Sequence, residues 1–355
     1  MTSKQALHYT PHNPLKVLNL GPIRFAHRSW EELSTKYNVE ILETSADNRD
    51  DFIKELISGK LQSANYIART FESAQRTGLF DEFLLKLVKE HTQVKAISHC
   101  GAGYDQVDAI ACGKLGIQLS NVPNVVDNAT ADTAVYLLLG AMRNFQLGAE
   151  NMKKGLWKSN GKCGGTPYGH DPERKVLGIL GMGGIGRTIR DRLLPYGFSK
   201  ILYHNRKPLS SDLGKGAIYC KTKEELYKKA DIICISIPLN EHTKHSVNAD
   251  AFSQMKNGVT IVNTARGPIV NEADLKEALK NGKVGSFGSD VWENEPDVDM
   301  ELISMPNVTV LPHMGTHTYE TMQGMEEHVV QNIIHYYETG KVLSMVPELS
   351  HVEFD

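Results

Sequence analysis

Short apolar runs alternate with longer amphipathic stretches along most of the chain. A run of four or five apolar residues is too short for a typical helix and indicates a buried strand, whereas apolar positions three and four apart indicate a helix. In the first third of the chain, strands are predicted at 17–20, 39–42, 65–68, 94–98 and 117–119, and helices at 30–37, 51–57, 81–90 and 105–115. Strands that alternate with helices are typical of a parallel sheet covered on both faces.

The longest amphipathic stretch before the middle of the chain covers residues 127–148 and predicts one long helix. It follows Pro123, and either Asp127 or Asn128 could cap its first turn. A second series then begins, with strands predicted at 176–180, 201–204, 232–237, 260–263, 286–291 and 309–311, and with helices that include 185–194, 272–279 and 320–337. The last helix is expected to pack back on the first unit. The sequence therefore predicts an α/β protein with one domain at 1–122 and 319–355 and a second at 123–318.

A glycine-rich turn, Gly181-x-Gly183-x-x-Gly186, joins the strand at 176–180 to the helix at 185–194. This order is the context of a dinucleotide-binding motif, although glycines alone would also fit a plain turn. The first glycine allows the tight turn, the second lets the backbone approach a pyrophosphate, and the third lets the helix pack closely on the strand. The amides at the start of the helix attract phosphate. We expect a Rossmann domain whose cofactor-binding residues include Gly181, Met182, Gly183, Gly184, Ile185 and Gly186.

The end of the next strand bears on which dinucleotide is bound. In such domains an acid about 20 residues after the glycines holds the ribose 2′-hydroxyl of NAD. Here Asn205 stands 19 residues after Gly186 and is followed by Arg206 and Lys207. No carboxylate is present to repel a 2′-phosphate, and two cations could attract it, although these residues would also suit a solvated turn. The sequence thus favours NADPH/NADP, with NADH possible at lower efficiency.

Composition narrows the class of protein. The chain has 355 residues, of which 41% are hydrophobic, and a net charge of −3. A full core is expected, and the lack of a long basic run argues against nucleic acid as a partner. The five cysteines form no CxxC pair, which indicates reduced thiols and a cytoplasmic protein. The polar arm at 1–14 contains no apolar signal core, and no stretch is long enough to span a membrane, so no membrane partner is expected.

Three later segments carry side chains of a recognisable pattern. They are Asn263-Thr-Ala-Arg266-Gly267, Asp290-Val-x-x-x-Glu295-Pro296 and Leu311-Pro-His313-x-Gly315-Thr316. These resemble the signatures of the D-isomer-specific 2-hydroxyacid dehydrogenases, and Gly101-Ala102-Gly103 resembles the substrate loop of that family. The resemblance covers nearly the whole chain. Within the family, the Asn205-Arg206 pair is similar to glyoxylate/hydroxypyruvate reductases, and the segments 128–133 and 311–317 are similar to fungal glyoxylate reductases. The chain departs from the family at Asp132, where Glu is common.

The resemblance implies a catalytic trio whose roles are chemically reasonable. Hydride addition to a ketone leaves negative charge on the oxygen, which needs a proton donor and a positive neighbour. His313 is expected to donate the proton, while Glu295 holds the imidazole in place and favours its charged form. Arg266 is expected to grip the carboxylate and keto oxygens of a 2-oxo acid. Each residue stands at or just after the carboxyl end of a predicted strand, where open α/β sheets place their ligands.

The resemblance also assigns the remaining contacts. Substrate-binding residues would be Gly101, Ala102, Gly103, Arg266 and His313. Asp290 would hold the nicotinamide carboxamide, and Thr243 would line the cofactor. Beyond the glycine turn, the expected cofactor-binding residues are Asn205, Arg206, Lys207, Pro238, Thr243, Thr264, Ala265, Arg266, Asp290, His313 and Gly315. His242-x-x-His245 could suggest a metal, but no carboxylate or thiol stands at ligand spacing, so no metal site is predicted.

By this resemblance the chain would be a reductase that transfers hydride to small 2-oxo acids, converting glyoxylate to glycolate and hydroxypyruvate to D-glycerate. A flavodoxin-like substrate domain would close with the Rossmann domain over the substrate. One alternative is a D-mandelate-type dehydrogenase for bulkier substrates, because pocket width cannot be read from the sequence. Another is a dinucleotide-sensing corepressor, which the lack of an obvious partner-binding tail disfavours. A homodimer is implied through the helix at 127–148 and the loop at 155–171, which is either an ordinary surface loop or an arm whose aromatics contact a second subunit.

Overall fold

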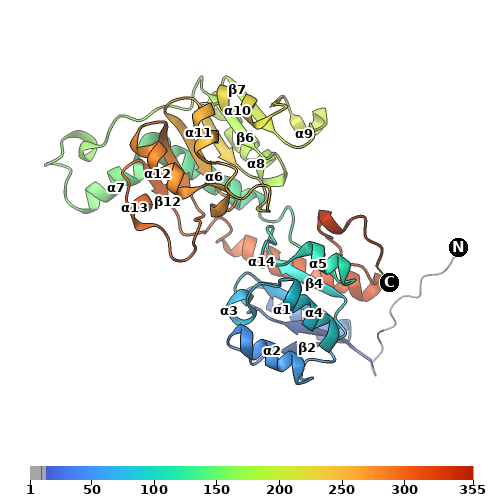
Figure 1. Ribbon diagram of the computed structural model, residues 1–355. Helices are drawn as coiled ribbons and strands as arrows, with labels where there is room; N and C mark the ends of the chain where they lie inside the picture. The colour runs from blue at the N-terminus through green and yellow to red at the C-terminus, as the bar shows by residue number, and fades with distance from the viewer. Residues whose placement is uncertain (1–8, 10–12, 355) are drawn as a thin grey trace. The chain divides into compact units, whose positions relative to one another are not determined.

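The structure is a computed structural model that describes residue 9 and residues 13–354 (Figure 1). Most of the arm expected at 1–14 therefore lies outside the described residues. The chain divides into two compact units. Unit 1 extends to Val126 and resumes at Thr318, and unit 2 comprises Asp127–His317. Unit 2 is thus an insertion that makes unit 1 discontinuous in sequence.

Unit 1 is built on a parallel sheet with the strand order β2-β1-β3-β4-β5. This is the flavodoxin-like doubly wound order, as expected. The strands are β1 (Leu15–Asn19), β2 (Val39–Glu43), β3 (Tyr66–Thr70), β4 (Ala96–Cys100) and β5 (Gln118–Ser120). Its helices are α1 (His27–Lys36), α2 (Arg49–Ile57), α3 (Ser73–Thr77), α4 (Glu82–His91), α5 (Ala109–Lys114) and α14 (Tyr319–Thr339), followed by the 3-10 turn η4 (Pro347–Leu349). The side chains of Asn48, Asp81 and Asp108 each accept an amide hydrogen bond at a helix start, which explains where α2, α4 and α5 begin.

Helix α14 returns the chain to unit 1. Its Tyr336 packs edge-on against Tyr66 of β3, with ring centroids 5.2 Å apart. Its Glu326 is buried and accepts hydrogen bonds from the amides of Arg24, Phe25 and Ala26 at 3.0, 2.9 and 2.8 Å. Three amides compensate the buried carboxylate, which ties α14 to the start of α1. The prediction that the last helix packs on the first unit is confirmed.

Unit 2 is built on a parallel sheet with the strand order β12-β11-β10-β9-β6-β7-β8. Strand β6 lies between β7 and β9, so the winding reverses there, and such a switch point is where doubly wound sheets bind ligands. The strands are β6 (Val176–Leu180), β7 (Lys200–His204), β8 (Ile218–Tyr219), β9 (Ile232–Ile235), β10 (Val259–Asn263), β11 (Val284–Ser289) and β12 (Val308–Val310). The helices are α6 (Asp127–Arg143), α7 (Phe145–Lys153), α8 (Gly184–Leu193), α9 (Ser211–Gly214), α10 (Lys223–Lys229), α11 (Ala249–Gln254), α12 (Glu272–Lys280) and α13 (Met300–Ile303). The prediction of a Rossmann sheet is confirmed.

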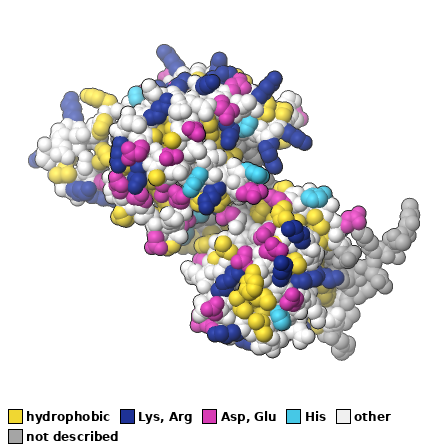
Figure 2. Space-filling view, viewed as in Figure 1, with side chains coloured by type: hydrophobic (Ala, Val, Ile, Leu, Met, Phe, Trp, Pro, Cys, Tyr) yellow, Lys and Arg dark blue, Asp and Glu magenta, His cyan; other side chains and the backbone are white. Residues whose placement is uncertain are grey.

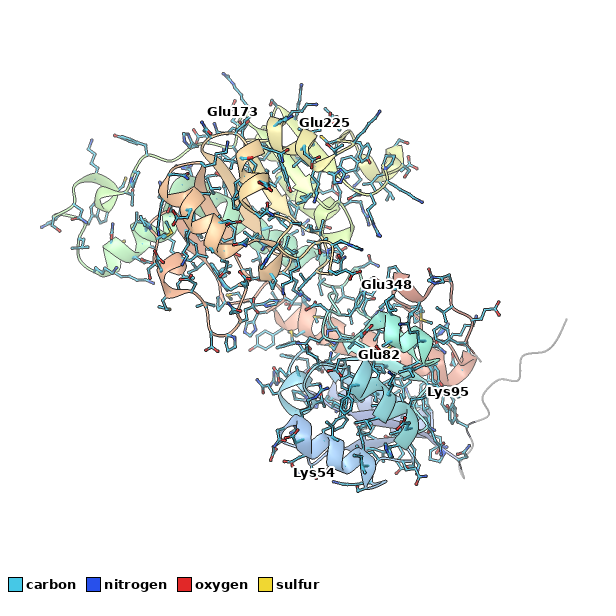
Figure 3. All side chains as sticks on the ribbon, viewed as in Figure 1. Lys54, Glu82, Lys95, Glu173, Glu225 and Glu348 are labelled. Atoms are coloured by element: carbon cyan, nitrogen blue, oxygen red, sulfur yellow. The ribbon has the colours of Figure 1, made fainter. Side chains whose placement is uncertain are left out.

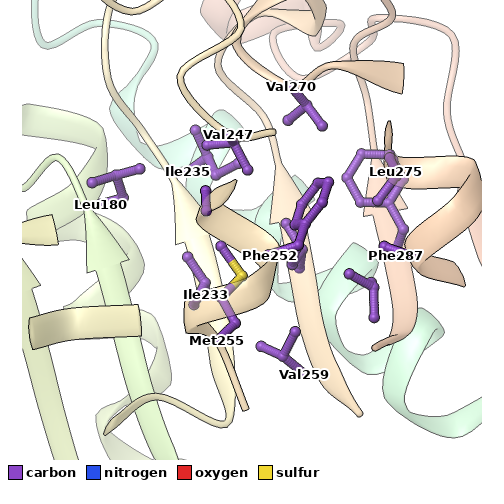
Figure 4. Packing of buried hydrophobic residues seen from close by; sticks show 14 of the residues in the cluster. Leu180, Ile233, Ile235, Val247, Phe252, Met255, Val259, Val270, Leu275 and Phe287 are labelled. Carbon is purple, nitrogen blue, oxygen red and sulfur yellow. The ribbon is translucent and has the colours of Figure 1, made fainter. Parts of the chain in front are cut away.

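Two hydrophobic clusters cover the two faces of this sheet. One joins β9 and β10 to α10, α11 and α12, with Ile233, Phe252 and Leu275 among its members (Figure 4). The other joins β6 to α6 and α8, and includes Leu137 and Ile189. A sheet buried on both faces is what continuous apolar strands require.

The single helix predicted at 127–148 is in fact two helices. Helix α6 ends at Arg143, and Asn144 takes a left-handed backbone conformation with φ +54 and ψ +32 before α7 begins. Asparagine tolerates this conformation better than most residues, so the chain can turn there without glycine. The following loop contains the 3-10 turn η1 (Lys162–Gly165). In that loop Trp157 is 58% exposed and Tyr168 is fully exposed.

Charged side chains of both signs are mixed on the visible surface (Figure 2). Lys54 on α2 and Glu82 on α4, labelled in Figure 3, are exposed examples. Within residues 13–354, none of the helices combines the length and the apolar character that crossing a membrane needs.

Candidate active site

The glycine turn leads from the carboxyl end of β6 into α8. Gly181 has φ +94, and a Cβ there would lie 2.4 Å from the Ser236 carbonyl oxygen. A Cβ on Gly186 would lie 2.2 Å from the carbonyl oxygen of Gly181, so neither position accepts a side chain. At Gly183 a Cβ would meet nothing within 4 Å, which leaves space for a pyrophosphate to approach the backbone. No side chain caps α8, so its first amides suit a phosphate. The turn fits a dinucleotide.

Asn205 lies directly after β7 and is bonded to the glycine turn. Its Oδ1 accepts a hydrogen bond from the Met182 amide at 2.7 Å, and its carbonyl oxygen accepts one from the Tyr219 hydroxyl at 3.1 Å. Asn205 stands where NAD-binding domains usually carry an acid. It is fixed beside the glycine turn and has no charge. The two cations that follow, Arg206 and Lys207, are exposed.

The loop after β9 is held together by hydrogen bonds between the Thr243 side chain and the backbone of the same loop. The hydroxyl of Thr243 donates to the Pro238 carbonyl at 2.7 Å and accepts from the Asn240 amide at 2.8 Å. Thr243 thus shapes the loop expected to line the cofactor.

The turn after β10 presents Arg266. The fully buried Asn263 donates from its side chain to the Arg266 carbonyl at 3.0 Å and accepts from the Ala265 amide at 3.0 Å. Thr264 is buried between them. A buried amide satisfied on both sides holds the backbone of the turn in place. The Arg266 guanidinium group donates from Nη1 to the Ala265 carbonyl at 2.8 Å.

The turn after β12 is organised by Asp290, which follows β11 and is 2% exposed. Its two carboxylate oxygens accept hydrogen bonds from the amides of Met314 and Gly315, each at 2.7 Å, and its carbonyl accepts one from the His313 amide at 2.7 Å. Burial raises the pKa of Asp290, and the two amides partly oppose the rise. These bonds hold His313 at φ +52, a strained conformation for this residue. Asp290 therefore positions His313, a role that sequence reasoning missed.

His313 and Glu295 form a pair. His313 Nδ1 lies 2.7 Å from Glu295 Oε2, and the other carboxylate oxygen accepts the Trp292 amide at 2.7 Å. Burial alone would raise the pKa of Glu295, but the hydrogen bond and charge of His313 outweigh it, with help from the Trp292 amide and the charge of Arg266, so the pKa falls below its ordinary value of 4.5. Because Glu295 occupies Nδ1, Nε2 is the nitrogen that can exchange a proton with a ligand.

The loop after β4 in unit 1 carries the expected substrate-binding glycines. The Gly101 amide donates to the His99 carbonyl at 2.9 Å, and the Asn121 side chain donates to the Ala102 carbonyl at 2.7 Å. The Gly101 amide is thus engaged within the chain. Within the part of the chain that the structure describes, the amides of Ala102 and Gly103 make no such bond.

Two further contacts could not be read from sequence spacing. Asp132 accepts a hydrogen bond from Arg192 Nε at 2.7 Å, which links α6 to α8. His245 Nε2 lies 2.5 Å from Glu293 Oε1, although the sequence offered it no carboxylate partner. No group of three or more His, Cys, Asp or Glu side chains that could hold a metal ion occurs among the described residues.

The chain resembles proteins of known family in sequence. The protein-family model for the NAD binding domain of D-isomer specific 2-hydroxyacid dehydrogenases matches residues 135–315 of this chain. Glyoxylate reductase 1 of Saccharomyces cerevisiae is 45% identical and covers 95% of this chain and 96% of its own length. 4-Methyl-2-oxopentanoate reductase A of Aspergillus oryzae is 41% identical, and the match covers 94% of this chain and 98% of that protein.

Solved structures resemble the chain as well. A glyoxylate reductase from Paecilomyes thermophila is 40% identical with a TM-score of 0.89, covering 95% of this chain and 99% of its own. The holo form of D-mandelate dehydrogenase from Rhodotorula graminis is 29% identical with a TM-score of 0.86, and the match covers 94% of this chain and 98% of that chain. An NADPH-dependent glyoxylate/hydroxypyruvate reductase from Sinorhizobium meliloti, in complex with NADP and malonate, is 28% identical with a TM-score of 0.81, covering 96% and 99%. Identity of this extent over nearly the full length of the relatives shows that the protein belongs to the D-isomer specific 2-hydroxyacid dehydrogenase family.

Proposed function

We propose that this protein is a reductase of small 2-oxo acids, acting on glyoxylate first and hydroxypyruvate second, with NADPH as the preferred cofactor. The observation that carries the proposal is the His313–Glu295 pair at 2.7 Å, beside the carboxyl edge of a sheet whose glycine turn fits a dinucleotide. The relatives named glyoxylate reductase in yeast and Paecilomyes support the substrate class.

The chain's own residues supply the acid and the charge that the reaction needs. The bound nicotinamide would deliver a hydride to the carbonyl carbon. His313, charged and held through Nδ1 by Glu295, gives its Nε2 proton to the carbonyl oxygen, which becomes the hydroxyl, and the imidazole is left neutral. Arg266 binds the substrate carboxylate and stabilises the charge that develops on the oxygen. In the reverse direction neutral His313 accepts the proton.

Cofactor binding would use the carboxyl ends of successive strands in unit 2. The pyrophosphate would lie against residues 181–186, and the ribose phosphate near Asn205, Arg206 and Lys207. The expected residues Pro238, Thr243, Thr264, Ala265, Asp290 and Gly315 would line the rest. In unit 1, considered by itself, the amides of Ala102 and Gly103 are suited to a carboxylate.

Selection among 2-oxo acids must come from the wall facing the substituent, because Arg266 would bind the part that all of them share. Met314 follows His313 and is 39% exposed. Methionine adapts its shape and excludes bulk poorly, and one methylene changes discrimination by about 1–3 kcal/mol. A preference for bulkier acids is therefore a second candidate, favoured by Met314 and by the relatives named for 4-methyl-2-oxopentanoate and D-mandelate.

A panel of substrates tests the proposal. With NADPH, we expect kcat/KM to be highest for glyoxylate, followed by hydroxypyruvate, with graded steps down to pyruvate, 4-methyl-2-oxopentanoate and phenylglyoxylate. If either of the last two exceeds glyoxylate tenfold or more, the small-pocket proposal is wrong. Turnover of none of them by the pure protein would favour a dinucleotide-sensing role.

The lowered pKa of Glu295 predicts a pH dependence. The carboxylate stays charged well into acid, below its ordinary pKa of 4.5, so above that pH Glu295 remains the negatively charged partner of His313 Nδ1. Glu295→Gln removes this charge and leaves one acceptor oxygen, which can keep either the contact with His313 Nδ1 or the bond from the Trp292 amide. Reductive kcat/KM should therefore fall at neutral pH, and the further loss below pH 4.5, where Glu295 of the wild type takes up a proton, should be absent from the variant. Glu241→Gln, beside the exposed His242, is the control and should leave the profile unchanged; an unchanged profile for Glu295→Gln as well would refute the pairing role.

We also propose a cytoplasmic homodimer. The loop at 155–171 presents the exposed Trp157 and Tyr168, and all five cysteines are unpaired, which suits a reducing compartment. Sedimentation at micromolar concentration should give twice the 39.4 kDa chain mass, and Trp157→Asp should shift the protein towards monomer. A wild-type monomer would contradict the dimer.

A further inference from the structure

The loop between β11 and α13 carries two glutamates that each hold a histidine. Glu295 pairs with His313 as described above. Two residues earlier, Glu293 Oε1 lies 2.5 Å from His245 Nε2. Both histidines have left-handed backbone conformations, with φ +52 at His313 and φ +50 at His245. Such conformations persist only where the surroundings hold them, so each carboxylate contact is part of a constrained arrangement.

Glu293 is anchored at a second point. Its amide donates to Glu272 Oε1 at 2.7 Å, and its own Oε2 lies 3.4 Å from the Glu272 amide. Glu272 is the first residue of α12 and is 7% exposed; burial raises its pKa. The loop is therefore fixed to the start of α12 as well as to His245.

The same loop is in direct contact with the turn that carries Arg266. A Cβ on Gly267 would lie 1.9 Å from the carbonyl carbon of Trp292 and 2.5 Å from the Glu293 nitrogen, so the two backbones touch where only glycine fits. The His245 amide in turn donates to the Pro268 carbonyl at 2.8 Å. Three segments meet here: the end of the loop after β9, the Arg266 turn and the loop that bears Glu295.

We propose that Glu293 and His245 are a positioning pair that fixes the Glu295 loop against the Arg266 turn and so sets the distance between Arg266 and the Glu295–His313 pair. Neither residue is assigned a contact with substrate. The proposal rests on the proposed roles of Arg266, Glu295 and His313. The side chains of His245 and Glu293 are 36% and 23% exposed, and pairs this accessible to water contribute little to global stability, so their loss should act on turnover more than on unfolding.

A double-mutant cycle tests the pair. His245→Asn removes the imidazole while keeping a residue that tolerates φ +50, and Glu293→Ala removes the carboxylate. Each should lower kcat about tenfold or more, because small misplacements of catalytic groups have large effects, with Tm nearly unchanged. The double variant should be no worse than the worse single variant. Glu293→Gln, which can still bond His245, should recover most of kcat.

The neighbouring pair Glu241–His242 provides the matched control. It lies in the same loop, is separated by 3.5 Å, and both side chains are more than four-fifths exposed. Glu241→Ala and His242→Asn should leave kcat at the wild-type value. The proposal is overturned if the effects of His245→Asn and Glu293→Ala add, if they match the controls, or if Glu293→Gln is as slow as Glu293→Ala.

Hydrogen exchange separates this inference from the proposed function, because it needs no turnover. In His245→Asn and in Glu293→Ala, segments 266–271 and 291–297 should both exchange faster than in wild type, and in the control variants neither should. Faster exchange in both segments would support the positioning pair even if no 2-oxo acid were reduced. Unchanged exchange in an enzyme that reduces glyoxylate would refute the pair and leave the proposed function intact.

Discussion

Replacing His313 with Ala should lower kcat for 2-oxo acid reduction by about 10²- to 10⁴-fold, the range that a general acid or base usually contributes. The reason is geometric: Glu295 holds Nδ1 at 2.7 Å, and Asp290 fixes the backbone of the same turn, so the chain positions one nitrogen, Nε2, to give the proton. The affinity for NADPH, measured by fluorescence titration, should stay near wild type, because the glycine turn is untouched.

The control for this variant is His317→Ala. His317 is an exposed histidine four residues along the same segment, and no catalytic contact is proposed for it. It should keep wild-type kcat. Because Ala at 313 must also adopt a left-handed conformation, His313→Asn is the companion variant: it tolerates φ +52 and should lose kcat to the same extent. Turnover within a few-fold of wild type in both position-313 variants would remove His313 from the proton-transfer step.

Features carried by short continuous stretches could be predicted from the sequence. The turn Gly181-x-Gly183-x-x-Gly186 could be recognised from the spacing of its glycines. In the structure a Cβ on Gly181 or Gly186 would collide with backbone, and a Cβ on Gly183 would meet nothing within 4 Å. The doubly wound parallel sheet of each unit was expected from alternating strands and helices together with the family resemblance, and both sheets are parallel in the structure. Asn205 could be placed by counting from the glycines, and its bond to the Met182 amide fits that placement.

Features that depend on distant segments or on single backbone conformations could not be predicted. His245 and Glu293 are 48 residues apart, and their loops meet because β9, β10 and β11 are neighbours in the sheet. The break at Asn144 was missed because helical periodicity continues on both sides of one left-handed residue. The cofactor contact expected of Asp290 stays a prediction. Its bonds to the turn of His313 could not be predicted, because they depend on the direction of two loop amides, which sequence patterns do not record.

Exchanging two residues after β7 should reverse the cofactor preference. In wild type we expect kcat/KM with NADPH to exceed that with NADH by about ten- to a hundredfold, since a hydrogen bond to a charged group contributes about 1.5–3 kcal/mol and each 1.4 kcal/mol is tenfold. The exposed Arg206 can pair with a 2′-phosphate, and neutral Asn205 does not repel one. Asn205→Asp with Arg206→Ser should erase or invert the preference.

The structure makes this exchange a clean test. Asn205 uses its oxygen, Oδ1, to accept the Met182 amide, and Asp can accept the same bond, so the glycine turn should keep its shape while the charge beside the ribose changes. The new carboxylate would bind a free 2′-hydroxyl and repel a phosphate. Lys200→Ser removes a cation from the opposite end of β7, away from the ribose, and should leave the ratio of kcat/KM with NADPH to kcat/KM with NADH unchanged.

The wild-type preference for NADPH should also weaken as the salt concentration rises, because an exposed charge pair is screened. If the wild-type protein uses NADH as well as or better than NADPH, Asn205 and Arg206 do not recognise the ribose 2′-phosphate. The His313 prediction does not depend on this result.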